Sequence, residues 1–317
     1  MEKLKFIDLF SGIGGIRLGL EQSFGKDNVE CIFASEIDKF AIKSYQHNFK
    51  ENNEIKNIYD INEKEIPDFD IALAGFPCQP FSKAGKELGF EDERGNLFFE
   101  IARILEEKKP SIVFLENVSR LKTHDNGDTF KVIVNKLESI GYKVYSKILN
   151  SKNFGLPQNR ERIFFVCFLD HSINFDFPTG KNIKTKMSDI LSEKVNDKYT
   201  LSDKMWTSMV SRKERNKKAG KGFGYRLFNH ESLYGSTISA RYGKDGSEVL
   251  IEQKDKNPRR LTPEEALKYQ GFPKEFEIIV SDTQAYKQFG NSVSVPVIKE
   301  IFDNINKAIR KKEKKID

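Results

Sequence analysis

Cys78 is the residue of this chain whose neighbours best suit covalent chemistry. It lies in Gly-Phe-Pro-Cys-Gln-Pro-Phe-Ser, residues 75–82, after an apolar run at residues 70–74 that is typical of a short buried strand. Prolines fix φ and cannot extend a strand ladder, so a stiff loop must hold the thiol just beyond the strand. At that edge of an open α/β sheet ligands bind, and a thiol can act as a nucleophile. A buried structural cysteine is the plainer interpretation, and this segment alone does not decide between the two.

An acid and two arginines also stand out by their positions. Glu116 interrupts the apolar run at residues 111–118 near its carboxyl end, and an acid in a covered strand is costly unless it is paired or functional. Arg160 and Arg162 lie two apart on an extended segment, so their side chains point to the same side. A surface salt-bridge pair is the alternative for the two arginines.

The chain opens with a pattern typical of a nucleotide-binding fold. An apolar strand at residues 4–10 leads through Ser-Gly-Ile-Gly-Gly into residues 16–24, which have helical spacing. Glu36 ends a second strand at residues 31–35, where an acid can accept hydrogen bonds from ribose hydroxyls. The glycine spacing is not the one that holds a pyrophosphate, which argues against a dinucleotide. Asp60 could accept from an adenine amino group, or be a turn residue or N-cap.

The remaining periodic segments predict an α/β fold. We expect helices at residues 97–105, 130–140, 263–269 (with Thr262 as N-cap) and 296–309, and strands at residues 143–149 and 162–169. Cys31 and Cys167 each lie in an apolar strand and are predicted to be core residues. The four histidines have no metal-like spacing, so no metal site is expected. No run of 18 apolar residues is present, so no membrane span is expected, and the N-terminus has no secretory signal pattern. The three cysteines are too far apart for a disulfide framework, which favours a reducing cytoplasm.

Charge is spread unevenly along the chain, whose formal net charge is +6. Residues 204–221 contain seven Lys or Arg and one acid, and glycine-rich stretches with Arg, Lys and Tyr follow up to residue 246. Such a segment is a candidate for contact with phosphates and base edges, although an ordinary flexible lobe has a similar composition. The basic tail at residues 307–317 is predicted to be a frayed end.

Taken together, these segments closely resemble the DNA (cytosine-5) methyltransferases of bacterial restriction–modification systems. The matching segments are Asp-Leu-Phe-Ser-Gly-Ile-Gly-Gly (8–15), Gly-Phe-Pro-Cys-Gln-Pro-Phe-Ser (75–82), Glu-Asn-Val (116–118), Gln-Asn-Arg-Glu-Arg (158–162), Arg-Leu-Thr-Pro-Glu (260–264), Gln-Gly-Phe-Pro (270–273) and Gln-Ala-Tyr-Lys-Gln-Phe-Gly-Asn-Ser-Val (284–293). The resemblance implies a Rossmann-like mixed, mostly parallel sheet with helices on both faces. Residues 1–180 and 284–317 would form the catalytic domain and residues 181–283 a smaller, irregular target-recognition domain.

The resemblance also implies a mechanism. Cys78, as thiolate, would add to C6 of a cytosine flipped out of duplex DNA, and Glu116 would protonate or hydrogen-bond N3 of the ring. C5 would then take a methyl group from S-adenosyl-L-methionine, leaving S-adenosyl-L-homocysteine. Arg160 and Arg162 would hold the flipped cytidine and its neighbouring phosphate and orient Glu116. The chain would act as a monomer in the cytoplasm, on nucleoid DNA, with a cognate restriction endonuclease as a possible functional partner.

The resemblance assigns further residues to the cofactor and the DNA. The cofactor set is Phe10, Gly12, Gly14, Glu36, Ile37, Asp60, Leu97, Asn291 and Val293. The DNA set is Ser82, Lys86, Arg94, Thr237, Arg241 and Tyr242, with residues 83–96 as a closing loop. Ile37 departs from the aromatic residue that relatives often have, which weakens stacking on the adenine. The stretch 222–246 suggests a target of the CCWGG or CCNGG type.

Three alternatives stay open at this point. A tRNA cytosine-5 methyltransferase would share the catalytic segments. A non-enzymatic DNA-binding protein could keep the fold, although the intact Cys78 and Glu116 argue against it. A nicotinamide oxidoreductase is disfavoured by the glycine spacing.

Overall fold

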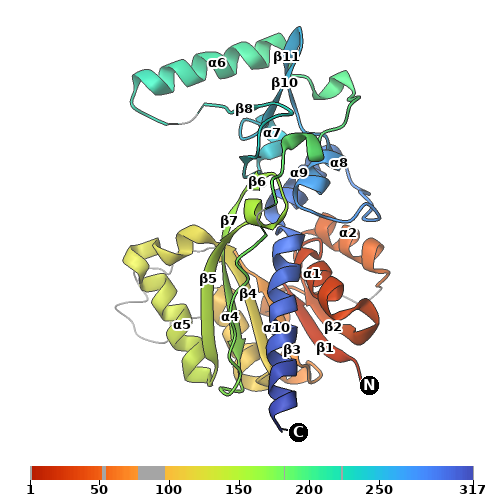
Figure 1. Ribbon diagram of the computed structural model, residues 1–317, viewed down its shortest axis with the longest axis vertical. Helices are drawn as coiled ribbons and strands as arrows, with labels where there is room; N and C mark the ends of the chain where they lie inside the picture. The colour runs from red at the N-terminus through yellow and green to blue at the C-terminus, as the bar shows by residue number, and fades with distance from the viewer. Residues whose placement is uncertain (1, 52–54, 78–96, 182, 223, 317) are drawn as a thin grey trace. The chain divides into compact units, whose positions relative to one another are not determined.

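Figure 1 shows the computed structural model of the chain, which describes residues 2–51, 55–77, 97–181, 183–222 and 224–316. The chain divides into two compact units. Unit 1 consists of Met1–Leu149, Glu161–Thr179 and Val297–Asp317, and unit 2 consists of Asn150–Arg160 and Gly180–Pro296. No helix among the described residues has the length and apolar character needed to cross a membrane.

A six-stranded sheet of order β2-β1-β3-β4-β7-β5 organises unit 1. Its strands are β1 (Leu4–Leu9), β2 (Val29–Ser35), β3 (Ile71–Gly75), β4 (Ile112–Val118), β5 (Lys143–Asn150) and β7 (Glu161–Phe168). The pairs β1–β2, β1–β3 and β3–β4 are parallel, and β7 runs antiparallel to β4. The predicted mixed, mostly parallel sheet is therefore confirmed, and the carboxyl ends of β1, β3 and β4 share one edge.

Helices cover both faces of this sheet, as the alternation of side chains along buried strands requires. On one face Ile7, Ala72 and Leu115 share an apolar core with α4 (Leu97–Lys108) and α5 (Asp128–Ile140). On the other, the ring of Phe114 packs against Phe302 of α10 (Val295–Ile316) with ring centroids 4.9 Å apart. α1 (Gly15–Phe24) lies against α10 so closely that a Cβ on Gly19 would come within 2.4 Å of Ile298. In Figure 1 α10 runs along the sheet.

The last helix corrects one expectation. α10 extends to Ile316, so the tail predicted to be frayed is helical nearly to its end. Lys312 pairs with Asp170, which follows β7, and Asn304 donates a hydrogen bond to the carbonyl of Asp176. These contacts secure a segment whose composition alone suggested a solvated end.

Unit 2 has little regular sheet. Its helices are α6 (Asp203–Lys218), α7 (Tyr242–Asp245), α8 (Pro263–Tyr269) and α9 (Asp282–Asn291), and its strands are β6 (Gln158–Asn159), β8 (Leu227–Phe228), β9 (Gly235–Ser236), β10 (Leu250–Gln253) and β11 (Lys256–Arg260). The strands form sheets of order β11-β10-β8 and β6-β9. The predicted helix at 263–269 is confirmed, with Thr262 as N-cap and a reciprocal bond from the Thr262 N–H to the Glu265 carboxylate.

Other described elements complete the chain. In unit 1 they are α2 (Lys39–Phe49), η1 (Lys26–Asn28), η2 (Ile58–Asp60), η3 (Glu63–Glu65), η5 (Ser119–Lys122) and η6 (His124–Gly127). In unit 2 they are η7 (Ser151–Phe154), η8 (Met187–Asp189) and η9 (Asp197–Tyr199).

The units do not follow the expected domain boundaries. Residues 150–160 and 284–296, expected in the first domain, belong to unit 2. The physical reason is a buried polar core. The Gln158 side-chain amide donates to the carbonyl of Tyr269 (2.8 Å), and the Gln270 amide donates to the carbonyl of Phe289 (2.6 Å). A Cβ on Gly290 would come within 2.2 Å of the Ser239 backbone, so only glycine permits this approach.

Candidate active site

Glu116 and Arg162 form an ion pair at the end of β4. The Arg162 Nε lies 3.0 Å from Glu116 Oε1, and Glu116 is only 8% exposed. The antiparallel register pairs Glu116 with Phe164 and Val118 with Arg162, so the two charged residues are diagonal neighbours on one face. Burial lowers the pKa of Arg162, an effect that the Glu116 carboxylate opposes. Because arginine stays protonated at neutral pH, the pair presents an oriented carboxyl group.

The beginning of the cysteine-containing segment is attached to this strand. Gly75, the last residue of β3, pairs with Glu116 in the parallel register. The Asn117 side chain then donates a 2.9 Å hydrogen bond to the carbonyl of Phe76, and both groups are buried. A Cβ on Gly75 would lie 3.7 Å from Glu116 Oε2. The described chain thus runs beside the Glu116 carboxyl group up to Pro77. Cys78 itself, with Ser82, Lys86, Arg94 and the closing loop at residues 83–96, lies outside the described residues.

The other two cysteines are unsuited to nucleophilic chemistry. Cys167 is fully buried, and burial raises the pKa of its thiol above the usual range. Cys31 is partly buried and its Sγ contacts the carbonyl of Phe33; burial raises the pKa of this thiol to about 12. A thiol of that pKa stays protonated near neutral pH and is a poor nucleophile. The core placement predicted for Cys167 is confirmed, and Cys31 lies at the margin of a small cluster with Tyr45 and Phe49.

Arg160 has different partners from Arg162. Its guanidinium donates to the carbonyls of Ile238 (3.1 Å), Gly290 (3.2 Å) and Ser292, all in unit 2. The residue is 1% exposed. Arg160 therefore ties its own segment of chain to two other backbone segments of unit 2, at Ile238 and at Gly290–Ser292, a role that two-residue spacing alone could not reveal.

The Glu36 carboxylate forms hydrogen bonds that link the turn after β1 to the chain after β2. Glu36 Oε2 accepts from the Gly12 N–H (2.9 Å), and Oε1 accepts from the N–H groups of Ile37 (2.7 Å) and Asp38 (2.9 Å). A carboxylate offers about four lone-pair sites, so one remains for a ligand hydroxyl. Gly12 has φ +54°, and a Cβ there would meet nothing within 4 Å. These groups fit a ribose beside an open backbone turn.

Gly14 differs from Gly12. Gly14 has φ +81°, and the ring of Phe49 occupies the space where its side chain would stand. A Cβ on Gly14 would come within 2.1 Å of that ring. Its glycine identity is therefore explained by packing within unit 1, without a ligand.

The other proposed cofactor residues are scattered over both units. Phe10 (φ 55°) and Leu97 pack partly buried against the core of unit 1. Ile37 is 73% exposed, and Asp60 is the exposed last residue of η2; the cap of that turn is Asn57. The bridge from Lys56 to Ser35 brings the chain leading to η2 beside the end of β2. Asn291 and Val293 belong to unit 2, where Asn291 is exposed and Val293 buried.

One predicted DNA contact is wrong. Tyr242 is 0% exposed; its hydroxyl donates to the carbonyl of Val249 (2.7 Å) and accepts from the Leu261 N–H (2.8 Å). Burial raises the pKa of this phenol well above its usual value. Tyr242 is a core residue of unit 2. Arg241, its neighbour, is exposed, and the Thr237 hydroxyl donates to the carbonyl of Asn159 (2.7 Å).

A buried acid that the sequence did not single out lies at the carboxyl end of β1. Asp8 is 1% exposed and accepts a 3.1 Å hydrogen bond from the hydroxyl of Tyr45, which in turn accepts from Arg17. Arg17 also pairs with Glu21 (2.6 Å) and Glu51 (2.5 Å). Burial raises the pKa of Asp8, and the smaller opposing effects of Arg17 and Tyr45 lower it. The net result is a pKa of about 7 in place of the usual 3.8.

This shift predicts a pH-dependent stability. Between pH 3.8 and about 7 the folded chain keeps a proton on Asp8 that the unfolded chain has lost, so the unfolding free energy falls as pH rises. At about 1.4 kcal/mol per pKa unit the fall is about 4 kcal/mol. Asp8→Asn cannot ionise, so its stability relative to the wild type should rise by that amount between about pH 4 and pH 8. Denaturant unfolding at several pH values measures it, and a constant difference between the two proteins contradicts it.

Comparison with known proteins identifies the family of the chain. The family model for C-5 cytosine-specific DNA methylases matches residues 4–307 of the sequence. The chain is 56% identical over 305 residues to the Type II methyltransferase M.NlaX of Neisseria lactamica, covering 96% of this chain and 97% of that protein. It is also 56% identical over 316 residues to M1.ScrFI of Lactococcus lactis subsp. cremoris, covering 98% and 80%.

Solved structures support the fold. A Spodoptera frugiperda DNMT2 mutant has a TM-score of 0.80 at 23% identity, covering 96% of this chain and all of that one. The Entamoeba histolytica methyltransferase EhMeth has a TM-score of 0.79 at 24% identity, covering 98% and 99%. A tRNA methyltransferase is not favoured, because the matching family model is one of DNA methylases. With the family model spanning nearly the whole chain and relatives above half identity, the chain belongs to the C-5 cytosine-specific DNA methylases.

Proposed function

We propose that the chain methylates C5 of a flipped-out cytosine at a specific site in duplex DNA, through a covalent bond between Cys78 and C6 of the ring. The hydrogen bond from Asn117 to the Phe76 carbonyl carries this proposal, because it fixes the chain two residues before Cys78 beside Glu116. A nucleophile and a proton donor would then face the same pyrimidine. The names of the relatives as Type II methyltransferases support a role as the modification enzyme of a restriction–modification system. A monomer that acts on cytoplasmic DNA alongside a cognate endonuclease is proposed on the family resemblance.

The side chains divide the chemical work. The Cys78 thiolate adds to C6, and Glu116 donates a proton or hydrogen bond to N3, so that electron density moves toward C5. The oriented pair with Arg162 keeps the Glu116 carboxyl group aimed at the ring. After methylation, loss of the C5 proton expels the Cys78 sulfur and restores the aromatic ring. The cytosine must leave the helix stack for this attack, at a cost of a few kcal/mol.

S-adenosyl-L-methionine, which supplies the methyl group, fits the edge formed by β1 and β2. Glu36 would accept from one of its ribose hydroxyls through the lone pair left by its three backbone bonds. The turn at Gly12 leaves open space where a side chain would stand, and Phe10, Asp60 and Leu97 of unit 1 would line the pocket. Asn291 and Val293, which belong to unit 2, stay proposed cofactor residues on the family resemblance alone. Exposed Ile37 would cover the adenine without aromatic stacking.

Unit 2 would recognise the target. Exposed Arg241 and the loop containing Thr237 are proposed to meet base edges. Arg160 would act as a positioning residue, because its bond to the Ile238 carbonyl sets the backbone next to Thr237. Ser82, Lys86 and Arg94, outside the described residues, are proposed to contact the DNA from the closing loop. A CCWGG- or CCNGG-like site is the proposed target.

A covalent trap tests the proposal. Bisulfite sequencing of plasmid DNA from an expressing host first identifies the methylated site. A duplex carrying 5-fluorocytosine at that position, incubated with the protein and S-adenosyl-L-methionine, should then yield a stable protein–DNA conjugate, because fluorine cannot leave as the C5 proton does. Peptide mapping should place the bond on Cys78. Methylated DNA without any conjugate would refute the covalent route.

A further inference from the structure

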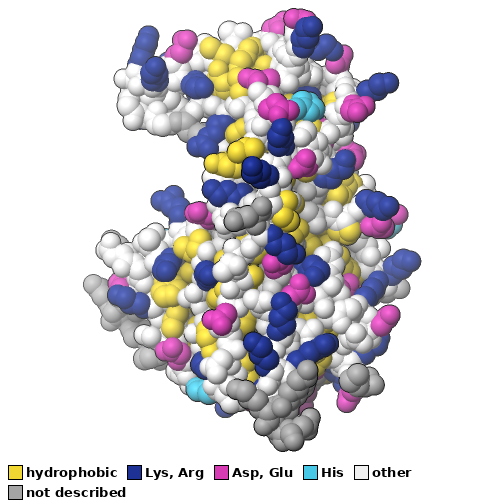
Figure 2. All heavy atoms as spheres, in the orientation of Figure 1, with side chains coloured by type: hydrophobic (Ala, Val, Ile, Leu, Met, Phe, Trp, Pro, Cys, Tyr) yellow, Lys and Arg dark blue, Asp and Glu magenta, His cyan; other side chains and the backbone are white. Residues whose placement is uncertain are grey.

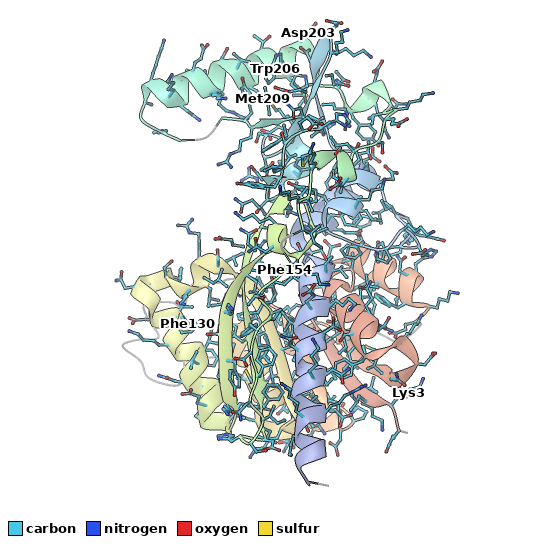
Figure 3. All side chains as sticks on the ribbon, viewed as in Figure 1. Lys3, Phe130, Phe154, Asp203, Trp206 and Met209 are labelled. Carbon is cyan, nitrogen blue, oxygen red and sulfur yellow. The ribbon has the colours of Figure 1, made fainter. Side chains whose placement is uncertain are left out.

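The helix α6 is unusual in how little of it is buried. Of its residues Asp203–Lys218 only Met209 is buried, in a cluster with Leu201 and Leu250 against which Met205 and Trp206 pack. All of these apolar contacts come from the first half of the helix. Figure 3 shows Trp206 and Met209 in the half of α6 that begins at Asp203. The second half therefore needs a reason other than apolar packing.

That second half and the turn after it are densely basic. Residues 212–221 contain Arg212, Lys213, Arg215, Lys217, Lys218 and Lys221 against one acid, Glu214. Figure 2 shows Lys and Arg side chains on this part of the molecule. Basic residues near a helix C-terminus do complement its dipole, by about 0.3–1 kcal/mol each. Bases three or four apart, however, repel one another by about 0.2–0.5 kcal/mol per pair, so the charge exceeds what the helix itself requires.

Two of these bases hold the helix in place and the others do not. Arg212 pairs with Asp245 of α7 at 3.0 Å. The Lys213 ammonium lies 4.1 Å from the centre of the Tyr225 ring, which also contacts Trp206 edge to face. Arg215, Lys217, Lys218 and Lys221 are exposed, and none of the four is paired with an acid in the part of the chain that the structure describes.

Within unit 2, contacts connect the basic helix α6 to the loop that contains Thr237. Next to Tyr225, the Arg226 guanidinium donates a 3.0 Å hydrogen bond to the Ser236 hydroxyl, and Ser236 precedes Thr237. Arg226 also belongs to the chain beside β10, since its carbonyl accepts from the Leu250 N–H. The exposed bases Arg226 and Arg241 thus flank the loop in the sequence. Arg226 is bonded to the loop, and α6 reaches the neighbouring Tyr225 through Lys213.

We propose that the second half of α6 and the turn that follows it, through Arg215, Lys217, Lys218 and Lys221, bind the phosphate backbone of duplex DNA outside the methylated site. The inference rests on the proposed function of unit 2 in recognising duplex DNA. Residues 212–218 span about 10 Å as a helix, the length over which a duplex presents about six backbone charges. Exposed, unpaired bases with rotatable side chains suit such contacts, which read no sequence.

The test compares two duplexes with the same central site, one ending about 3 bp from it and one extending about 15 bp on each side, since only the longer offers flanking phosphates. The variant is Arg215→Gln/Lys217→Gln/Lys218→Gln. A matched control, Lys307→Gln/Arg310→Gln/Lys311→Gln, removes the same charge from exposed positions of α10 in unit 1. Affinity is measured with S-adenosyl-L-homocysteine present, over a range of salt concentrations.

We expect the variant to bind the long duplex at least about 10-fold more weakly than the wild type at about 50 mM salt, while the short duplex is bound equally. Three lost phosphate contacts make the negative slope of log affinity against log salt less steep by about 2.7. The control variant should keep the wild-type slope, and Glu214→Gln should tighten binding to the long duplex only.

Several results would overturn the inference. They are an unchanged slope for the α6 variant, an equal loss in the control variant, an equal loss on the short duplex, or a loss of binding to duplex RNA or anionic vesicles with DNA binding intact. The proposed function has its own readout. A wild-type chain that methylates DNA but binds both duplexes equally refutes only the role of α6, whereas one that methylates no DNA refutes the proposed function.

Discussion

Replacing Cys78 by alanine should abolish methyl transfer to DNA, with a fall in rate of about 10⁴-fold or more, as for removal of other covalent nucleophiles. Without the sulfur, nothing adds to C6 and C5 does not become nucleophilic. The expected loss concerns chemistry alone, so affinity for DNA should change little. Transfer of a radiolabelled methyl group and a gel-shift assay on the same duplex measure the two quantities.

The chain provides its own controls for this experiment. Cys31→Ser keeps a hydrogen-bonding group next to the Phe33 carbonyl, and Cys167→Ala removes a thiol that burial keeps protonated. Both variants should methylate DNA at close to the wild-type rate once their folding is confirmed. If Cys78→Ala still turned over, or if a Cys31 variant lost activity while folded, the nucleophile would have been misassigned.

Glu116→Gln should slow methyl transfer by about 10²–10⁴-fold, the usual contribution of a positioned acid or base. Glutamine preserves the shape of the side chain and an oxygen that can accept from Arg162 Nε, so the structure at the end of β4 should persist. What it removes is the exchangeable proton that N3 of the ring requires. Single-turnover rates from about pH 6 to pH 9 measure this effect separately from binding.

A double-substitution cycle sharpens this prediction. Because Arg162 orients Glu116, Arg162→Gln combined with Glu116→Gln should be little worse than Glu116→Gln alone. Glu252→Gln in β10 removes the same charge elsewhere and should leave the rate unchanged. Additive losses in the double variant would show that the two side chains act independently, against the proposed pairing.

The sheet could be predicted from the sequence because its buried strands are nearly continuous apolar runs. α6 could not, since only Met209 is buried and the helix lacks an apolar stripe; the N-cap Ser202, whose hydroxyl accepts from the Met205 N–H, was the one available signal. The end of α10 was missed for a similar reason, because charge alone suggested solvent.

The candidate site was predictable by residue type but not by partner. Sequence spacing grouped Arg160 with Arg162. In the structure Arg160 bonds to backbone carbonyls of unit 2, whereas Arg162 pairs with Glu116. Gly12 and Gly14 look alike in sequence, and only the Phe49 ring distinguishes them. Tyr242 resembled a surface residue among glycines, while the Val249 and Leu261 backbone groups that bury its hydroxyl lie too far along the chain for any local pattern to show.

The chain passes from unit 2 to unit 1 between Arg160 and Glu161. This boundary determines which segments two related methylases must exchange to swap their target sequences. A chimera that transplants only residues 181–283 from a relative would separate the donor's Ile238 position from the host's Arg160 and Gly290. Grafts cut at the unit boundaries carry Asn150–Arg160 together with Gly180–Pro296. They keep Arg160 with backbone carbonyls that its guanidinium binds, those of Ile238 and Gly290. Recombination that alters the target sequence is therefore expected to inherit two separate stretches of gene together.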